Sequence, residues 1–193
     1  MPGNTDMYHS VLIVSASEQF VQLIKKSLKG FVTTDVRISI ASARMCILER
    51  YYDLIVINMP LPDETGEEFA VDAAEKSNAS VLLVASQDVY EDVLQKVTDH
   101  GILVMPKPSP RGRIDKAVRY LTAVQNKIHE QELKTRAAEE KLEEMRMVDR
   151  AKFLLMEEKH MSEDEAHRYI GKQAMDNGVS RGRAARRIID EIE

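Results

Sequence analysis

Asn58 ends an apolar run at a position where a carboxylate could have performed chemistry. Residues 53–66 read Asp-Leu-Ile-Val-Ile-Asn-Met-Pro-Leu-Pro-Asp-Glu-Thr-Gly, which predicts a buried strand, a proline-bounded loop and a glycine turn. An amide oxygen is a far poorer nucleophile than a carboxylate, and it carries no charge to attract Mg²⁺. Asn58 therefore lacks both abilities that an aspartate would bring to this position.

Basic side chains gather near the C-terminus of a chain whose net charge is -5. Residues 1–110 hold nine basic and fifteen acidic residues, whereas residues 111–193 hold eighteen and seventeen. Within the window 168–187, six basic residues face a single acidic one, Asp176. This local excess predicts an anionic partner, although a solvated helix face gives the same pattern. The six are Arg168, Lys172, Arg181, Arg183, Arg186 and Arg187.

Other residues show no arrangement typical of catalysis. The sequence has no recognisable nucleophile–base pair, metal-ligand set or phosphate-binding loop, so we predict a protein that is not an enzyme and needs no metal or cofactor. The single cysteine, Cys46, lies in the helix-like stretch 42–50 and is predicted to be a buried structural thiol. His160 and His167 have no partners at metal-ligand spacing and are predicted to be surface residues.

Short apolar runs alternate with helix-like stretches through residues 9–110. The apolar runs predict strands at 11–14, 36–40, 54–57, 81–84 and 102–105, with helices at 18–29, 42–50, 66–76 and 88–99. Strands that are apolar throughout indicate a parallel sheet covered on both faces. Right-handed crossovers then give a doubly wound α/β sandwich of (βα)₅ type.

A long helical stretch begins near Arg113 and meets no proline or glycine until Gly171. Apolar and small residues recur in it at alternating steps of three and four, which predicts a coiled-coil seam. A helix of ~35 residues is ~50 Å long, longer than the preceding domain should be wide, so we predict a self-dimerising coiled coil at 111–147, with packing on its own chain as the alternative. The seam positions are Ile114, Ala117, Leu121, Val124, Ile128, Gln131, Thr135, Ala138, Leu142 and Met145.

Residues 148–193 are predicted to form a compact helical unit. The long helix should end near His160, and Ser162 with Glu165 forms a capping box for a second helix that ends near Met175. A turn at 176–178 precedes Ser180, which is a suitable cap for a third helix. A unit this small should depend on the long helix beside it for its core.

Residues 1–110 resemble a response-regulator receiver domain, which has a flavodoxin-like fold. In that family the first strand is followed by an acidic pair, the third ends in the phospho-acceptor aspartate, the fourth in Thr or Ser, and the fifth in Lys. Here Ser15 and Ala16 stand at the acidic pair, Asn58 at the acceptor and Ala85 at the hydroxyl, while Lys107-Pro108 matches the pattern. The resemblance therefore implies a degenerate receiver that aspartyl phosphorylation does not switch, unless a shift in register makes Asp53 or Asp63 the acceptor.

The C-terminal 142–193 resemble an ANTAR domain, an RNA-binding antiterminator module. The resemblance rests on residues 148–156, Ser162-Glu163-Asp164-Glu165-Ala166, Gln173-Ala174-Met175, Ala185 and Ile188-Ile189, while Phe153 and Arg181 depart from the family pattern. It implies binding of two small hairpins in an mRNA leader, which keeps the overlapping terminator hairpin from forming. The implied RNA contacts are Lys152, Arg168, Lys172, Arg181, Arg183, Arg186 and Arg187, with Tyr169 expected in the core and base stacking as its alternative.

Two other functions remain open at this stage. A DNA-binding response regulator would use the C-terminal helices as a helix-turn-helix, and an adaptor would use the coiled coil to dock a protein. The receiver-like domain could also be gated by a small ligand or a regulatory protein. The sequence has neither a membrane-length apolar run nor a signal-peptide pattern, so we expect a soluble cytoplasmic protein.

Overall fold

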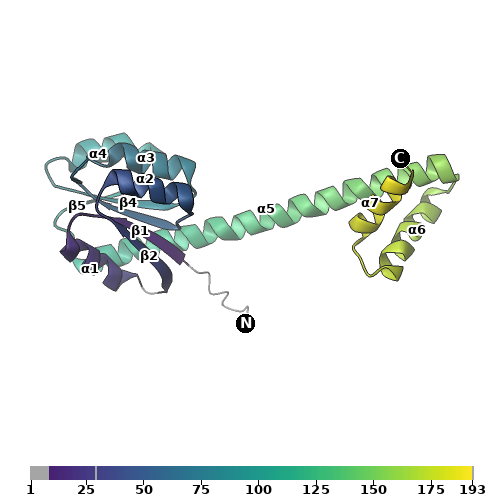
Figure 1. Cartoon of the computed structure of the whole chain (residues 1–193), viewed down its shortest axis with the longest axis horizontal. Helices are drawn as coiled ribbons and strands as arrows, with labels where there is room; N and C mark the ends of the chain where they lie inside the picture. The colour runs from purple at the N-terminus through teal and green to yellow at the C-terminus, as the bar shows by residue number, and fades with distance from the viewer. Residues whose placement is uncertain (1–8, 29, 193) are drawn as a thin grey trace. The chain divides into compact units, whose positions relative to one another are not determined.

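The computed structural model describes residues 9–28 and 30–192, and it contains two compact units, 1–129 and 130–193. The first unit is a five-stranded parallel sheet in the order β2-β1-β3-β4-β5 (Figure 1). Its strands are β1 (His9–Val14), β2 (Phe31–Arg37), β3 (Leu54–Asn58), β4 (Ser80–Ala85) and β5 (Leu103–Pro106). The predicted doubly wound α/β fold is confirmed.

Helices cover both faces of this sheet. One face carries α2 (Ile40–Glu49), α3 (Glu67–Lys76) and α4 (Tyr90–Val97), and a short 3₁₀ turn (Thr98–His100) follows α4. The other face carries α1 (Glu18–Ser27) and the first turns of α5 (Arg111–Lys159). Cys46 is buried and free in α2, as predicted. Of the predicted helix 18–29, Lys29 lies outside the described residues.

The predicted second strand was placed too late in the chain. Residues 36–40 were assigned from their apolar character, but β2 is Phe31–Arg37 and Ile40 belongs to α2. An edge strand is half-exposed, so its residues alternate between the two environments instead of forming an apolar run. Ser39 is the N-cap of α2 and accepts from the Ser42 N–H, and Asp63 accepts hydrogen bonds from the backbone N–H groups of Ile40 and Ala41, at 3.0 and 2.9 Å, so α2 begins at Ile40.

The start of α5 packs on the sheet of its own chain. Ile114, Val118 and Leu121 are buried against β-strand residues and α1, and Gln125 is also buried. The structure thus gives this segment a different role from the intermolecular seam predicted to begin at Ile114. The buried stripe contains Val118 and Gln125 where the predicted seam had Ala117 and Val124. A five-stranded sheet needs two helices to cover this face, and α1 supplies only one.

The second unit consists of the later part of α5 with α6 (Glu163–Asp176) and α7 (Arg181–Ile192). Its core contains small and aliphatic side chains from all three helices, including Ala151, Leu155, Ile170, Ala185 and Ile188. The predicted capping box is present, since Ser162 accepts from the Glu165 backbone and Glu165 accepts from the Ser162 backbone. No helix among the described residues is long and apolar enough to cross a membrane.

Candidate functional sites

The carboxyl ends of β1 and β3 place Ser15 and Asn58 against each other. Asn58 is the last residue of β3, and its Nδ2 donates a hydrogen bond to Ser15 Oγ at 2.9 Å. The two side chains are 7% and 1% exposed, so this contact is buried. Asn58 Oδ1 is also buried and accepts no hydrogen bond from the described residues. The neighbouring Ala16 is exposed and offers no functional group.

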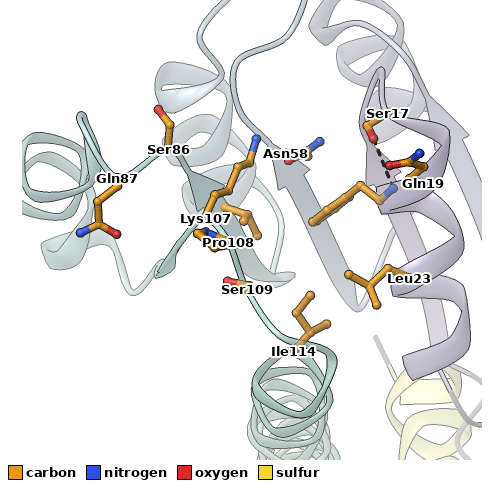
Figure 2. A pocket seen from close by; sticks show the side chains of 12 residues that line it. Ser17, Gln19, Leu23, Asn58, Ser86, Gln87, Lys107, Pro108, Ser109 and Ile114 are labelled. Carbon is orange, nitrogen blue, oxygen red and sulfur yellow. Dashed lines mark hydrogen bonds between the residues drawn. The ribbon is translucent and has the colours of Figure 1, made fainter.

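Lys107 reaches the same end of the sheet from the residue after β5. Figure 2 shows Lys107 beside Asn58, and the Lys107 Nζ donates to the carbonyl of Met59, the residue that follows Asn58. Burial lowers the pKa of the Lys107 ammonium group, because removing a charge from water disfavours its charged form. Within the described residues Lys107 makes no ion pair with a carboxylate. The structure therefore keeps a cation at this edge without an acidic partner.

The end of β4 carries no hydroxyl group at the position where the family has Thr or Ser. Ala85 is the last residue of β4 and is buried, while Ser86 follows it and is half-buried. Ser86 hydrogen-bonds to Asp88, and this bond lowers the pKa of the Asp88 carboxyl group. Ser86 is the next hydroxyl along the chain, one residue after the predicted position.

The two aspartates that a register shift would have made acceptors are both committed to other contacts. Asp53 precedes β3 and lies at the end of this strand opposite to Asn58. Its carboxylate accepts from the Ser10 backbone N–H at 2.7 Å and from the Ser10 hydroxyl at 3.0 Å. Asp63 caps α2, and the Ala41 and Ile40 N–H groups lower the pKa of its carboxyl group. No three His, Cys, Asp or Glu residues in 9–28 and 30–192 gather as a metal site.

A cavity of about 570 Å³ opens at the carboxyl end of this sheet. Asn58, Ser86 and Lys107 contribute its polar lining from the strand ends, and Phe20 and Leu23 contribute an apolar wall from α1 (Figure 2). Sequence reasoning missed this wall, because the amphipathic pattern of α1 assigns both residues simply to the core. The sequence signal that could have indicated this wall is the presence of apolar residues in the first turns of the helix that follows β1.

A basic surface lies on the second unit, where α6 and α7 turn their outer faces to solvent. On α7 the residues Ala184, Ala185 and Ile188 are buried, which leaves the positions of Arg183, Arg186 and Arg187 exposed. On α6 the inward positions are Ala166, Ile170 and Ala174, so Arg168 and Lys172 point outward at a spacing of four. We define the basic surface as Arg168, Lys172, Arg183, Arg186 and Arg187.

The cations of this surface are largely uncompensated. Lys172, Arg183, Arg186 and Arg187 make no ion pair within the part of the chain that the structure describes. Arg168 lies close enough to Glu165 to help lower the pKa of that carboxyl group. Unpaired cations held on the outer faces of two adjoining helices can bind phosphate groups.

Lys152 has a different environment from the other predicted RNA contacts. Its side chain is 18% exposed, and its Nζ lies 3.0 Å from Asp149 and 3.1 Å from Glu163. These carboxylates raise the pKa of Lys152. The pattern in sequence suggested an RNA contact, but in the structure the charge of Lys152 is satisfied between α5 and the start of α6. We therefore do not include it in the basic surface.

Arg181 is exposed, so its predicted RNA contact stays a prediction, whereas Tyr169 differs from its expectation. Arg181 is exposed at the start of α7 and lines a smaller cavity of about 360 Å³ beside Lys141 and His167. Tyr169, expected in the core, is 37% exposed and is absent from the core cluster of the second unit. Its ring is thus accessible on α6 beside Arg168.

The start of α7 is fixed by a contact that the sequence did not reveal. The backbone N–H of Gly182 donates to Glu144 Oε1 of α5 at 2.9 Å. A Cβ on Gly182 would lie 2.8 Å from Glu144 Cγ, so only glycine allows this approach. Ser180 caps the same helix by accepting from the Arg183 N–H at 3.3 Å, as predicted. These contacts orient the face of α7 that carries the arginines.

Comparison with known proteins assigns both units to recognised types. Residues 136–189 match the ANTAR domain family. The transcriptional regulatory protein PdtaR of Mycobacterium tuberculosis is 24% identical over 141 residues, which cover 72% of this chain and 68% of that protein. The match to the ANTAR domain begins at residue 136, so it overlaps the segment 111–147 that we predict as coiled coil.

Solved structures resemble the chain in fold. The signal receiver domain of an HD domain-containing protein from Pseudomonas fluorescens Pf-5 aligns with a TM-score of 0.58 and 18% identity, covering 67% of this chain and 98% of that one. A CheY-like receiver domain from Methanospirillum hungatei JF-1 aligns with a TM-score of 0.55 and 17% identity, covering 63% and 98%. At these identities the likeness establishes the receiver fold alone.

Proposed function

Because this chain is a response regulator that joins a receiver-type domain to an ANTAR domain, we propose that it is an RNA-binding transcription antiterminator. The observation that carries the proposal is the basic surface, whose unpaired cations lie on the outer faces of two helices within the matched region. Such a surface holds RNA phosphates, while exposed bases in hairpin loops are read by stacking and hydrogen bonding. Tyr169 is an accessible ring beside it.

The mechanism follows from competition between RNA structures. Two small hairpins in an mRNA leader, once held by the protein, cannot refold into the terminator hairpin that overlaps them. Each hairpin binds one basic surface, so two copies of the chain grip one leader. Linked binding of two hairpins raises the overall affinity above that of either alone.

A dimer is supported by the apolar residues that α5 leaves uncovered. Beyond the part of α5 that packs on the sheet, Ile128, Leu142 and Met145 are 37%, 50% and 56% exposed, and all three are positions of the predicted seam. In a dimer these side chains would meet their counterparts on a second chain. The seam begins near Ile128 in this proposal, since the residues before it are used within the receiver-type unit.

The receiver-type unit is not switched by aspartyl phosphorylation in this proposal. The end of β3 offers a buried amide, the residues after β1 offer no carboxylate, and Asp53 and Asp63 hold structural positions elsewhere. Phosphoryl transfer needs an anionic acceptor with a metal to neutralise the charge of the transferring group. Titration with beryllofluoride and Mg²⁺ tests this directly, and saturable binding that Asn58→Ala abolishes would overturn it.

Charge reversal tests the RNA-binding surface. In the double variant Arg183→Glu/Arg186→Glu we expect affinity for a two-hairpin leader RNA to fall and its dependence on salt to weaken by roughly one unit of slope per lost phosphate contact. The matched control is Lys25→Glu/Lys26→Glu, which makes the same charge change on exposed positions of α1. Duplex DNA that outcompetes the RNA would indicate a DNA-binding regulator instead. Unchanged RNA affinity in the double variant would indicate an adaptor.

A further inference from the structure

The cavity at the end of the receiver-type sheet lies where α/β proteins bind ligands. The strand order β2-β1-β3 reverses between β1 and β3, and the cavity is lined by Asn58 at the end of β3 and by residues that follow β1, β4 and β5. Open parallel sheets bind small molecules at such a switch point, outside the carboxyl ends of their strands. A volume of about 570 Å³ falls within the range of small-molecule pockets.

The charge of the cavity is set by one residue. Among the described residues, Lys107 is the single charged side chain in the lining, and its Nζ bonds to the Met59 carbonyl rather than to a carboxylate. A partly buried ammonium group without a counter-charge is stabilised by any anion that enters beside it. Ser15, Ala16 and Asn58 offer no carboxylate to neutralise this charge, so the site favours an anion over a cation.

The remaining lining is suited to an organic molecule rather than to a bare ion. Phe20 and Leu23 from α1 and Ile114 from α5 form apolar walls, and Gln19 and Asn58 offer amide groups among them (Figure 2). Apolar walls with a few placed polar groups are typical of sites for small organic ligands. One cation balances one negative charge, whereas a phosphate dianion would leave charge uncompensated in a partly buried site.

We infer that this cavity binds a small organic carboxylate, with the Lys107 ammonium group as its counter-ion and Phe20, Leu23 and Ile114 around its apolar body. The ligand takes the place that a phosphoryl group and its metal occupy in a phosphorylated receiver. This binding does not depend on the RNA-binding function of the second unit, so the two can fail separately.

Titration of the full-length ¹⁵N-labelled chain tests the inference. The probes are benzoate, the neutral isostere benzamide, and inorganic phosphate. We expect benzoate to cause saturable shifts of the backbone resonances of Leu23, Asn58 and Lys107, and we expect benzamide and phosphate to bind at least about tenfold more weakly, because each lacks the charge or the apolar body. Absence of saturable shifts with benzoate, or equal affinity for either of the other probes, would overturn it.

Variants at Lys107 separate a charge effect from loss of folding. Lys107→Met should weaken benzoate binding at least about tenfold, and Lys107→Arg, which retains the charge, should restore most of it. Lys25→Met removes an exposed lysine of α1 outside the cavity and should leave affinity unchanged. Benzoate affinity that is the same in Lys107→Met as in the unaltered chain, with the same resonances shifted, would contradict the inference.

Discussion

At the scale of single residues, the carboxyl end of the sheet carries Lys107 together with Ser15 and Asn58, neither of which is a carboxylate. Asn58 Nδ2 and Ser15 Oγ satisfy each other through one buried hydrogen bond, whereas the buried Asn58 Oδ1 has no hydrogen-bond donor among the described residues. Lys107 lies at the same end of the sheet and has no acidic partner within the part of the chain that the structure describes. In our proposal, this arrangement favours an anion at a place where a working receiver would bind a metal cation.

Asp63 illustrates how a carboxylate near this edge serves folding instead of catalysis. Its pKa is lowered by the Ala41 and Ile40 N–H groups, so it stabilises the fold above its ordinary pKa of 3.8, and this contribution is lost as pH falls through the lowered value. We expect Asp63→Asn to lower the urea midpoint at pH 7 and the difference from the unaltered chain to shrink toward pH 3. Asp99→Asn, an exposed position in the turn after α4, is the control. A pH-independent difference would contradict this reading.

At the scale of elements, α5 has two roles that follow each other along one helix. Its first turns cover the sheet and are anchored by Gln125, whose Nε2 donates to the Asn78 carbonyl at 2.8 Å and whose Oε1 accepts from Ser80 at 3.1 Å. Its later turns supply one wall of the second unit's core. The hydrogen bonds of Gln125 mark the end of the part of α5 that packs on the sheet.

Removal of that anchor should destabilise the receiver-type unit alone. Gln125→Ala removes the two hydrogen bonds that join α5 to the Asn78 carbonyl and to Ser80, and at about 0.5–1.5 kcal/mol for each bond this should cost about 1–3 kcal/mol. Gln131→Ala, an exposed position on the same helix, should change stability by less than about 0.5 kcal/mol. Native-state hydrogen exchange of β4 amides measures the first effect. Equal exchange in the two variants would show that the anchor contributes nothing.

Two glycines in the second unit should respond to alanine in opposite directions. Gly182→Ala forces a Cβ against Glu144 in α5 and should destabilise the unit by about 1–3 kcal/mol. Gly171→Ala lies in α6 with no atom near the new Cβ and should stabilise it by about 0.5–1 kcal/mol, since alanine favours a helix. Thermal unfolding of the two variants, read by circular dichroism, gives the comparison. Shifts of the same sign would contradict the close approach.

At the scale of the whole molecule, the chain links a ligand-sized cavity, an exposed apolar seam and a basic surface. Each lies on a different set of elements, and each is suited to a different partner: a small anion, a second copy of the chain and RNA. The single-chain structure leaves the seam residues uncovered, so self-association is the prediction that concerns the molecule as a whole.

Leu142 and Leu133 offer a matched test of that association. Both are exposed leucines of α5, at 50% and 64%, but only Leu142 occupies the predicted seam. We expect Leu142→Glu to convert a dimer into a monomer in sedimentation equilibrium and to lower affinity for a two-hairpin RNA toward that for one hairpin. Leu133→Glu should remain dimeric. A chain that is monomeric without either change would eliminate the seam.

The local patterns of the sequence determined the order and type of the elements. Apolar strand runs, the Ser162–Glu165 capping box, and the uninterrupted helical stretch after Arg113 depend on neighbours in the chain, and the structure contains all of them. The sequence also shows that position 58 has no carboxylate, since this depends on residue type alone. The predicted bounds of the edge strand β2 were wrong, because its half-exposed residues do not form a continuous apolar run.

Only the tertiary structure decided which faces of those elements were used. The stripe Ile114, Val118, Leu121 and Gln125 turns inward because a sheet face needed a second helix, and periodicity cannot tell a chain's own sheet from a partner helix. Lys152 reads like the other cations in sequence, yet distant Glu163 pairs with it. The cavity joins residues from α1, β3 and α5 that are far apart in the chain, so its charge and walls exist only once the fold brings them together.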